Sequence, residues 1–385
     1  MINKKRLTRL MQQLVRINSE NPPGDERAVA AFVAGQLRRA GFKPGITAYA
    51  PRRDNVMAVL KGREKKYSVL LSPHLDTVPA GSGWHHGPFS GELEAGRIYG
   101  RGATDCKGNV AVALEVLRSL KEDRVPLRGD WIFLATADEE TGSAQGLVPW
   151  LEKSRVRPDC ALILDADAFN IVPAQKGLIH FKVEVPGRKA HGAYPHRGVN
   201  AIDSALALIA ALKKMKFISR PHALLAPPTV NIGTIRGGDK VNMVADWCVF
   251  EVDLRFLPRM DAAKILAAIK TKFRGTGIPF RLVVDDIQQP YEISSGHPLV
   301  RGLKAAARGI APSRVTGSEG ATVITFFRRK NIPAVATGWG TSGCAHATDE
   351  YARVADLYRG ARVLERFIRI FDAGFSPAAG KRFFC

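Results

Sequence analysis

The sequence predicts an α/β protein with a mixed, largely parallel sheet flanked by helices, into which a smaller α+β domain is inserted. Within the first 165 residues, short apolar runs alternate with helical patterns, and the same alternation returns after residue 320. Between these segments the strands become apolar on one side only. Alternating strands and helices are typical of a parallel sheet covered by helices, whereas one-sided strands indicate an antiparallel sheet.

Three continuous apolar runs in the first segment predict buried strands, at residues 67–72, 130–137 and 160–165. The stretch NVAVALEVLRSL at 109–120 predicts a helix between the first two of these strands. The N-terminal stretch predicts an amphipathic helix, because four apolar side chains recur on one face: Leu7, Leu10, Met11 and Leu14. In the last segment we expect a helix, a strand with its loop, and an amphipathic helix, at 320–331, 332–340 and 356–371.

The middle of the chain predicts the inserted domain. In HFKVEVPG at 180–187, Phe181, Val183 and Val185 lie on one side of a half-buried strand. The patterns that follow predict a helix, two strands, a helix and a strand, at 201–216, 229–236, 246–256, 261–274 and 280–286. The order β-α-β-β-α-β is that of a ferredoxin-like domain. We therefore assign residues 178–290 to this domain, and residues 1–177 and 291–385 to the α/β domain.

The composition is that of a soluble globular protein, with 45% hydrophobic and 24% charged residues among 385. No apolar run reaches the roughly 18 residues of a membrane span, and the N-terminus lacks the features of a secretory signal. The five cysteines are scattered without a CxxC pair, so we expect no disulfide framework. A cytoplasmic protein without membrane contact is the expectation.

The net charge of +21 is the unusual feature of the composition. Such a charge is compatible with nucleic-acid binding, with steering of anionic substrates, or with a host whose proteins are basic. Because lysines and arginines are spread along the whole chain, the charge alone does not favour nucleic acid.

Histidine and acidic residues follow the predicted buried strands where each strand ends: His74, Asp76, Asp138, Glu139, Glu140, Asp165 and His346. Asp105 follows the glycine-rich stretch GRIYGRGAT. In open α/β sheets ligands bind beyond the carboxyl ends of the strands, so these side chains should gather at one edge.

Several carboxylates in one crevice require a cation, since otherwise they hold a proton between them. Imidazole and carboxylate ligands suit zinc, with cobalt or manganese as alternatives. Five ligands are too many for one tetrahedral ion and suit two ions bridged by a carboxylate. Taken singly, each residue has an ordinary interpretation as a helix cap or a solvated loop residue. Their joint occurrence at strand ends favours the metal site.

Motifs in order along the chain resemble those of the M20 metallopeptidase family: SPHLDTVPAG, YGRGATDCKGNVA, TADEETGS, VPAQKG, VPGRKAHGAYPHRGVNAI, GGDKVNMVAD, DLRFLP and GCAHATDEY. The resemblance covers essentially the whole chain. Members of that family include acetylornithine deacetylase, succinyl-diaminopimelate desuccinylase, aminoacylase and carboxypeptidase G.

The resemblance implies two divalent metal ions, with zinc as the first choice. His74 and Asp165 would bind one ion, and Glu140 and His346 would bind the other. Asp105 would bridge the two ions. The resemblance also implies that Asp76 orients His74 and that Glu139 is the general base. It further implies that the inserted domain is a lid that forms a homodimer, in which His191 reaches the partner's site. Asn242 and Arg255 match substrate-binding positions, Arg255 as a fork for a carboxylate.

The chain also departs from the family pattern. Asp165 stands where many members have glutamate, and Asp167 is a nearby rival ligand. Cys106 follows the bridging aspartate where methionine is frequent, and Cys344 precedes His346 by two residues. We interpret both cysteines as packing residues, with sensitivity to oxidation as the alternative. His85 and His86 are interpreted as loop residues near the substrate entrance.

The resemblance implies hydrolysis of an N-acyl amino acid, of the desuccinylase or deacetylase type. Dipeptidase, carboxypeptidase and aminoacylase activities are alternatives within the family. A different class, a polyanion-binding protein on an inactive hydrolase scaffold, is disfavoured because Glu139 and all five ligand positions are present.

Overall fold

The computed structural model describes residues 1–320 and 322–374, which form two units. The first unit comprises Met1–Pro173, Ile293–Thr316 and the residues from Phe326 on; the second comprises Ala174–Glu292 and Gly317–Thr325. Most of the second unit, Ala174–Glu292, is therefore inserted between two segments of the first unit.

The central sheet of the first unit has the strand order β1 (Gly45–Ala48), β2 (Asp54–Leu60), β6 (Asp130–Ala135), β3 (Ser68–Ser72), β7 (Cys160–Leu164), β15 (Ala334–Thr337) and β8 (Ile171–Gln175). The neighbours β6, β3, β7 and β15 run parallel, whereas β1, β2 and β8 are antiparallel to their neighbours. The predicted mixed, largely parallel sheet is thus confirmed. The carboxyl ends of its four parallel strands lie at the same edge.

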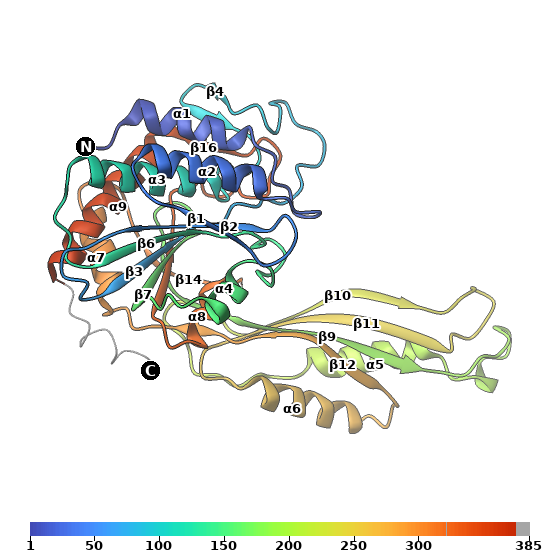
Figure 1. Ribbon diagram of the computed structural model, residues 1–385. Coiled ribbons are helices and arrows are strands. Elements are labelled where there is room, and N and C mark those ends of the chain that lie inside the picture. The colour runs from blue at the N-terminus through green and yellow to red at the C-terminus, as the bar shows by residue number, and fades with distance from the viewer. Residues whose placement is uncertain (321, 375–385) are drawn as a thin grey trace. The chain divides into compact units, whose positions relative to one another are not determined.

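Helices α1 (Lys4–Val15), α2 (Arg27–Arg39) and α3 (Lys107–Glu122) cover one face of this sheet (Figure 1). In α3, 13 of 16 residues are buried, which makes it the inner helix of that layer. The helix α9 (Val354–Gly374) packs against α3 and against α7 (Pro298–Ala307). Shorter helices are α4 (Leu147–Lys153) and α8 (Ile324–Arg328). Among the described residues, no helix combines the length and the apolar character needed to cross a bilayer.

A small antiparallel sheet with the order β16 (Tyr351–Arg353), β5 (Arg97–Tyr99) and β4 (Glu92–Glu94) also belongs to the first unit. Its strands have three residues each, too few for a periodic pattern in the sequence. Because Tyr351 pairs with Tyr99, the segment after His346 lies beside the loop that carries Asp105.

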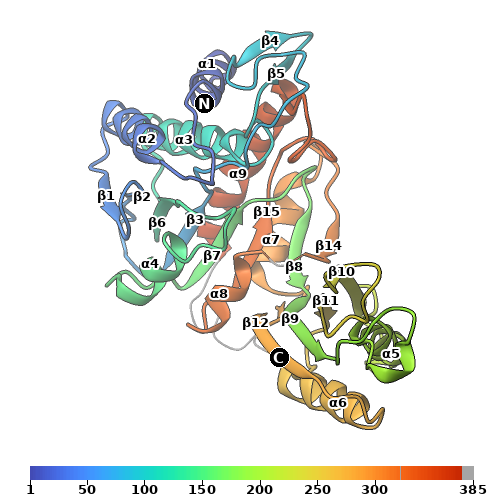
Figure 2. The ribbon, with the colours of Figure 1, turned by 90° about the vertical axis from the view of Figure 1, so that its right-hand side faces the viewer.

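The second unit contains a four-stranded antiparallel sheet, in the order β10 (Thr229–Gly237), β11 (Trp247–Phe256), β9 (Gly177–Pro186) and β12 (Arg281–Gln288). Helices α5 (Ala201–Lys213) and α6 (Ala262–Arg274) lie on the same face of this sheet (Figures 1 and 2). Phe181, Val183 and Val185 point into the resulting core, as their alternation predicts. The predicted order β-α-β-β-α-β is confirmed.

Three shorter elements complete the described chain: η1 (Pro195–Arg197), β13 (Tyr291–Glu292) and β14 (Val315–Ser318). The last two pair with β8. The helix predicted over 320–331 is wrong in length: α8 spans only Ile324–Arg328, and residue 321 lies outside the described residues.

Candidate metal centre

His74 stands two residues beyond the end of β3 and is almost fully buried. Its Nε2 lies 2.9 Å from Asp105 Oδ1 and 3.4 Å from Asp165 Oδ1. Asp165 directly follows β7, and its backbone N–H donates to Thr337 O at the end of β15. The ends of the neighbouring parallel strands β3 and β7 thus bring His74 and Asp165 together, and the loop before α3 adds Asp105.

His346, on the loop after β15, completes a second group of side chains. Its Nε2 lies 3.2 Å from Asp105 Oδ2 and 3.3 Å from Glu140 Oε2. The two oxygens of Asp105 therefore face different histidines, so that this carboxylate is shared. Ligand atoms within 4.8 Å of one another form two groups: His74, Asp105, Cys106 and Asp165 in one, and Asp105, Glu140 and His346 in the other.

Glu350 fixes the loop that presents Asp105. Its buried carboxylate accepts hydrogen bonds from the backbone N–H groups of Gly102, Thr104 and Asp105, at 3.1, 2.8 and 3.0 Å. The guanidinium of Arg101 donates to it as well, at 2.7 Å. Sequence reasoning placed Glu350 within the GCAHATDEY motif but gave it no role.

Asp76 connects the loop of Glu139 and Glu140 to His74. Its two carboxylate oxygens accept the backbone N–H groups of Glu139 and Glu140, each at 3.0 Å. Nδ1 of His74 lies 3.0 Å from the backbone oxygen of Asp76 and 3.4 Å from its Oδ1. Although burial opposes ionisation, the contacts with His74 and Asn21 hold the pKa of Asp76 below its ordinary value. Asp76 thereby positions both halves of the site.

A buried network that sequence reasoning missed stands behind Asp76. Nη2 of Arg53 donates to Asn21 Oδ1 at 2.9 Å, and Nδ2 of Asn21 donates to Asp76 Oδ2 at 2.9 Å. Arg53 also pairs with the buried Glu26 at 2.7 Å. Asn21 precedes two prolines, which in sequence indicates only a turn. No strand end or motif draws attention to Arg53.

The electrostatics of the protein alone show an excess of buried negative charge. Burial, followed by repulsion from Asp165, raises the pKa of Glu139 well above its ordinary value. Burial also raises the pKa of Asp165 to about 6. Hydrogen bonds that His346 donates to the carboxylates of Asp105 and then Glu140 raise its pKa to about 10. The site therefore attracts protons, and a divalent cation would compensate the same charge.

Glu140 provides a direct test of whether the residues fit a cation. Its Oε1 is buried and accepts no hydrogen bond from the described residues. A buried, unpaired carboxylate oxygen is costly unless a cation binds it. The surrounding donor set of imidazole nitrogens and carboxylate oxygens is the one that zinc and similar metals prefer. The residues present thus fit two such ions with a shared carboxylate.

Cys106 lies in the first group but is a poor ligand. Its Sγ accepts the backbone N–H of His74 at 3.1 Å, and burial raises the pKa of its thiol to about 12. Metals bind the thiolate, so the contacts favour the packing role that we inferred.

Asp167, the rival of Asp165, belongs to neither group. It contacts Asn170 instead, at 3.3 Å.

His85 and His86 also lie outside both groups. Nδ1 of His85 is 2.6 Å from Asp349 Oδ2, and the ring of His86 stacks on Tyr99 at 3.8 Å between centroids. Their described partners are therefore residues of the surrounding loops and the small sheet.

His191, Asn242 and Arg255 all belong to the second unit. His191 is exposed, and its Nδ1 accepts the backbone N–H of Ala193 at 3.1 Å, which leaves Nε2 to carry the proton of a neutral ring. Asn242 lies beside it, because its backbone oxygen accepts the N–H of Gly192 at 2.8 Å.

Arg255 lies in β11, apart from that loop. Its Nε and Nη2 donate to the two carboxylate oxygens of Asp253, at 2.7 and 2.8 Å. The guanidinium group of Arg255, which we expected to bind a substrate carboxylate, therefore binds the carboxylate of Asp253 in this structure. Its role in substrate binding stays a prediction.

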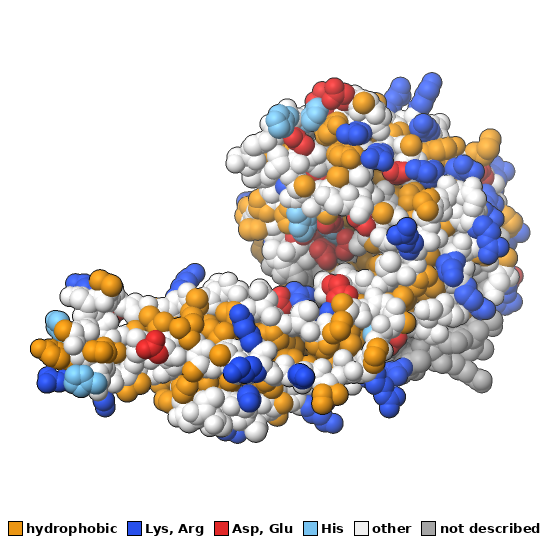
Figure 3. Space-filling model, turned by 180° about the vertical axis from the view of Figure 1, so that it is seen from behind, with side chains coloured by type: hydrophobic (Ala, Val, Ile, Leu, Met, Phe, Trp, Pro, Cys, Tyr) orange, Lys and Arg blue, Asp and Glu red, His pale blue; other side chains and the backbone are white. Residues whose placement is uncertain are grey.

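Basic and acidic side chains are distributed differently over the visible face of the molecule. Lysine and arginine side chains are scattered widely, whereas acidic side chains gather beside a histidine on one part of the first unit (Figure 3). The net charge of +21 is therefore not concentrated at the candidate metal centre, whose possible ligands are mainly acidic and histidine residues.

Comparisons with known proteins extend these observations. The pattern of peptidase family M20/M25/M40 matches residues 70–370. Acetylornithine deacetylase from Shigella sonnei is 33% identical over 304 residues, covering 74% of this chain and 75% of that protein. Aminopeptidase PepT from Bacillus cereus has a TM-score of 0.81 at 24% identity, over 95% of this chain and 98% of that one.

The YxeP protein of Bacillus subtilis, described as a dinuclear metal-binding peptidase from the M20 family, has a TM-score of 0.75 at 16% identity. The match covers 97% of this chain and 99% of that one. The likenesses to PepT and YxeP concern the fold. The family pattern and the match to acetylornithine deacetylase concern the sequence itself.

Proposed function

The chain belongs to peptidase family M20/M25/M40 and is a hydrolase of amide or peptide bonds, and from this premise we propose that it cleaves the amide bond of an N-acyl amino acid. The observation that carries the proposal is the shared carboxylate of Asp105 between two groups that each contain one histidine. The likeness to acetylornithine deacetylase favours a deacetylase or desuccinylase over a dipeptidase.

In this proposal two divalent ions, with zinc as the first choice, are held by the two groups described above. His74 and Asp165 would hold one ion, Glu140 and His346 the other, and Asp105 both. When bound, such ions polarise the amide carbonyl and make water a stronger nucleophile at neutral pH. Asp76 keeps His74 and the backbone of Glu140 in place for this purpose.

Glu139 is the proposed general base. It is next to the proposed ligand Glu140 but belongs to neither ligand group, and its carboxylate has no hydrogen-bond partner among the described residues. Its backbone is fixed by Asp76, so the side chain stays at the site while its carboxylate remains free. It would take a proton from the attacking water and pass it to the leaving amine.

The second unit is the proposed lid and dimerisation domain. Eight of the eleven exposed large hydrophobic side chains found among the described residues lie in this unit, including Leu206, Ile235 and Trp247. Exposed apolar side chains and the free edge of β10 are features that pairing with a second copy would cover. His191 of one subunit would then donate its Nε2–H to the substrate carbonyl oxygen in the site of its partner.

We expect about two metal ions per chain when the protein is loaded with zinc and dialysed, because two groups of ligands share Asp105. Asp105→Ala should lose both ions, and Glu140→Ala should retain about one. Asp167→Ala is the matched control, since this carboxylate lies close by but outside both groups, and it should retain two. Elemental analysis gives the ratios. A wild-type ratio near zero contradicts the metal proposal.

A panel of substrates tests the reaction itself. The zinc-loaded protein should hydrolyse N-acetylornithine or N-succinyl-diaminopimelate faster than simple dipeptides, measured as kcat/KM by release of the free amine. Dipeptides as the preferred substrates would replace the deacylase proposal by a dipeptidase. Absence of turnover on every amide, with metals bound, would contradict the proposed function.

A further inference from the structure

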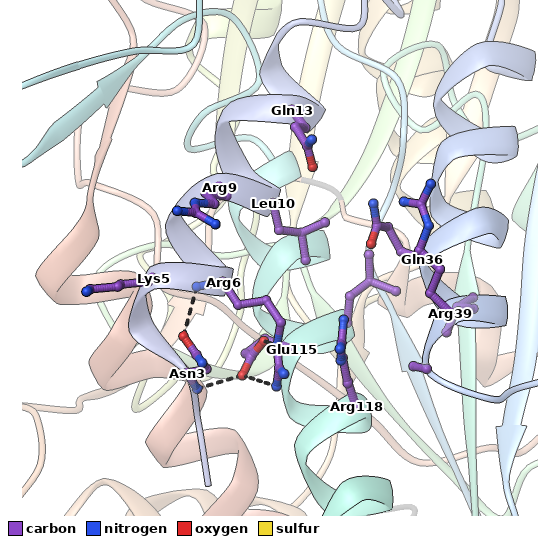
Figure 4. A pocket seen from close by; sticks show the side chains of 13 residues that line it. Asn3, Lys5, Arg6, Arg9, Leu10, Gln13, Gln36, Arg39, Glu115 and Arg118 are labelled. Atoms are coloured by element: carbon purple, nitrogen blue, oxygen red, sulfur yellow. Dashed lines mark hydrogen bonds and ion pairs between the residues drawn. The ribbon is translucent and has the colours of Figure 1, made fainter.

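A cavity of about 460 Å³ lies in the first unit between α1, α2 and α3 (Figure 4). None of its thirteen lining residues belongs to the two ligand groups. Gln13 and Leu10 from α1, Gln36 from α2 and Arg118 from α3 extend into the space between the helices (Figure 4). The cavity is large enough for a small organic ligand and too large for a single simple anion.

The lining of this cavity is strongly cationic. It contains five basic side chains against one carboxylate, Glu115, and the basic ones are Lys5, Arg6, Arg9, Arg39 and Arg118. Glu115 is already engaged, because Arg6 donates to it at 2.6 and 2.8 Å and Asn3 N at 2.7 Å. Arg118 pairs with Glu122 at 2.7 Å, and Arg6 reaches the same carboxylate at 3.1 Å.

Three of the cations remain without compensation. The side chains of Lys5, Arg9 and Arg39 form no ion pair or hydrogen bond with any residue that the structure describes. The side-chain amides of Gln13 and Gln36 likewise have no hydrogen-bond partner among these residues. Lys5 extends away from the space between the helices (Figure 4), which leaves Arg9 and Arg39 as the uncompensated cations of the lining. Like charges around one cavity repel one another, and a multivalent anion removes this repulsion.

The floor of the cavity is apolar, since the buried side chains of Leu37 and Leu114 line it. Guanidinium groups bind phosphate oxygens through two parallel hydrogen bonds, which makes arginine the preferred residue for phosphate recognition. We propose that this cavity is a binding site, separate from the candidate metal centre, for a small compound with two or more phosphate groups. The amides and the apolar floor would contact the uncharged part of a nucleotide.

The test measures equilibrium binding to the zinc-loaded, full-length protein by calorimetry, with tripolyphosphate, ATP and citrate as probes. The double variant Arg9→Ala/Arg39→Ala removes two exposed, unpaired cations from the cavity. The matched control is Arg63→Ala/Arg155→Ala, which removes two exposed cations of the same unit that do not line it. Chelation of metal by a probe acts equally on all three proteins, so it does not imitate occupation of the cavity.

Wild type and control should bind one ATP or one tripolyphosphate per chain. The double variant should bind about a hundredfold more weakly, from about tenfold for each lost charge-assisted contact. Tighter binding of ATP than of tripolyphosphate identifies a nucleotide, and equal binding identifies a free oligophosphate. The proposal is overturned if no saturable binding occurs, if control and double variant weaken equally, or if citrate binds more tightly than both phosphates.

Discussion

Replacing Glu139 by glutamine is expected to lower turnover by about 10² to 10⁴-fold, the usual contribution of a general base. The upper part of this range is expected, because the same carboxylate would also return the proton to the leaving amine. Metal content should stay at the wild-type value, since Glu139 belongs to neither ligand group. The loop should also stay in place, because Asp76 holds it through the backbone N–H of Glu139.

The measurement combines kcat with elemental analysis of the same preparation. Glu152→Gln, the same change at an exposed position on α4, is the control and should leave both values unchanged. Glu140→Gln provides the contrast, since it should lower metal content together with turnover. If Glu139→Gln keeps turnover within about threefold of wild type, the base is another group.

His191→Ala is expected to depress turnover by about 10²-fold or more while leaving the metal content intact, as loss of one oxyanion donor typically does. The physical reason is the exposed Nε2–H, which is free to donate because Nδ1 is occupied by Ala193. His196→Ala, an exposed histidine of the same segment, is the matched control and should retain turnover.

Mixing two inactive variants distinguishes action across the dimer from action within one chain. If His191→Ala and Glu139→Gln subunits exchange, half of the dimers are mixed, and each has one site with both groups intact. Activity should then recover to about a quarter of the wild-type value, as two-fold symmetry requires. No recovery, with exchange verified by mass spectrometry, would show that His191 does not serve the partner's site.

The parallel part of the sheet could be predicted because its strands are buried on both faces. Residues 69–71 in β3 and 161–164 in β7 form continuous apolar runs, and the polar side chains after them mark the edge where ligands gather. The assignment of roles to His74 or Glu139 required the family resemblance, because spacing alone does not say which carboxylate is shared.

Other features leave too weak a signal in the sequence. The strand β1 is fully exposed and has four residues, and the strands of the small sheet have three. Arg53 and Asn21 act through contacts between segments that are distant in sequence, and a polar residue in a turn has many ordinary explanations. The engagement of Arg255 by Asp253 likewise depends on side-chain geometry that no motif specifies.

The position of β15 in the central sheet has a consequence for folding during synthesis. This strand lies between β7 and β8, yet residues 177–288, with all four strands and both helices of the second unit, leave the ribosome before it. Domains generally fold as units during synthesis, so the second unit should fold first. Until Thr337 has emerged, β7 presents an apolar, unpaired edge that favours aggregation. His346 is made later still, so an unfinished chain lacks the second ligand group of the candidate metal centre.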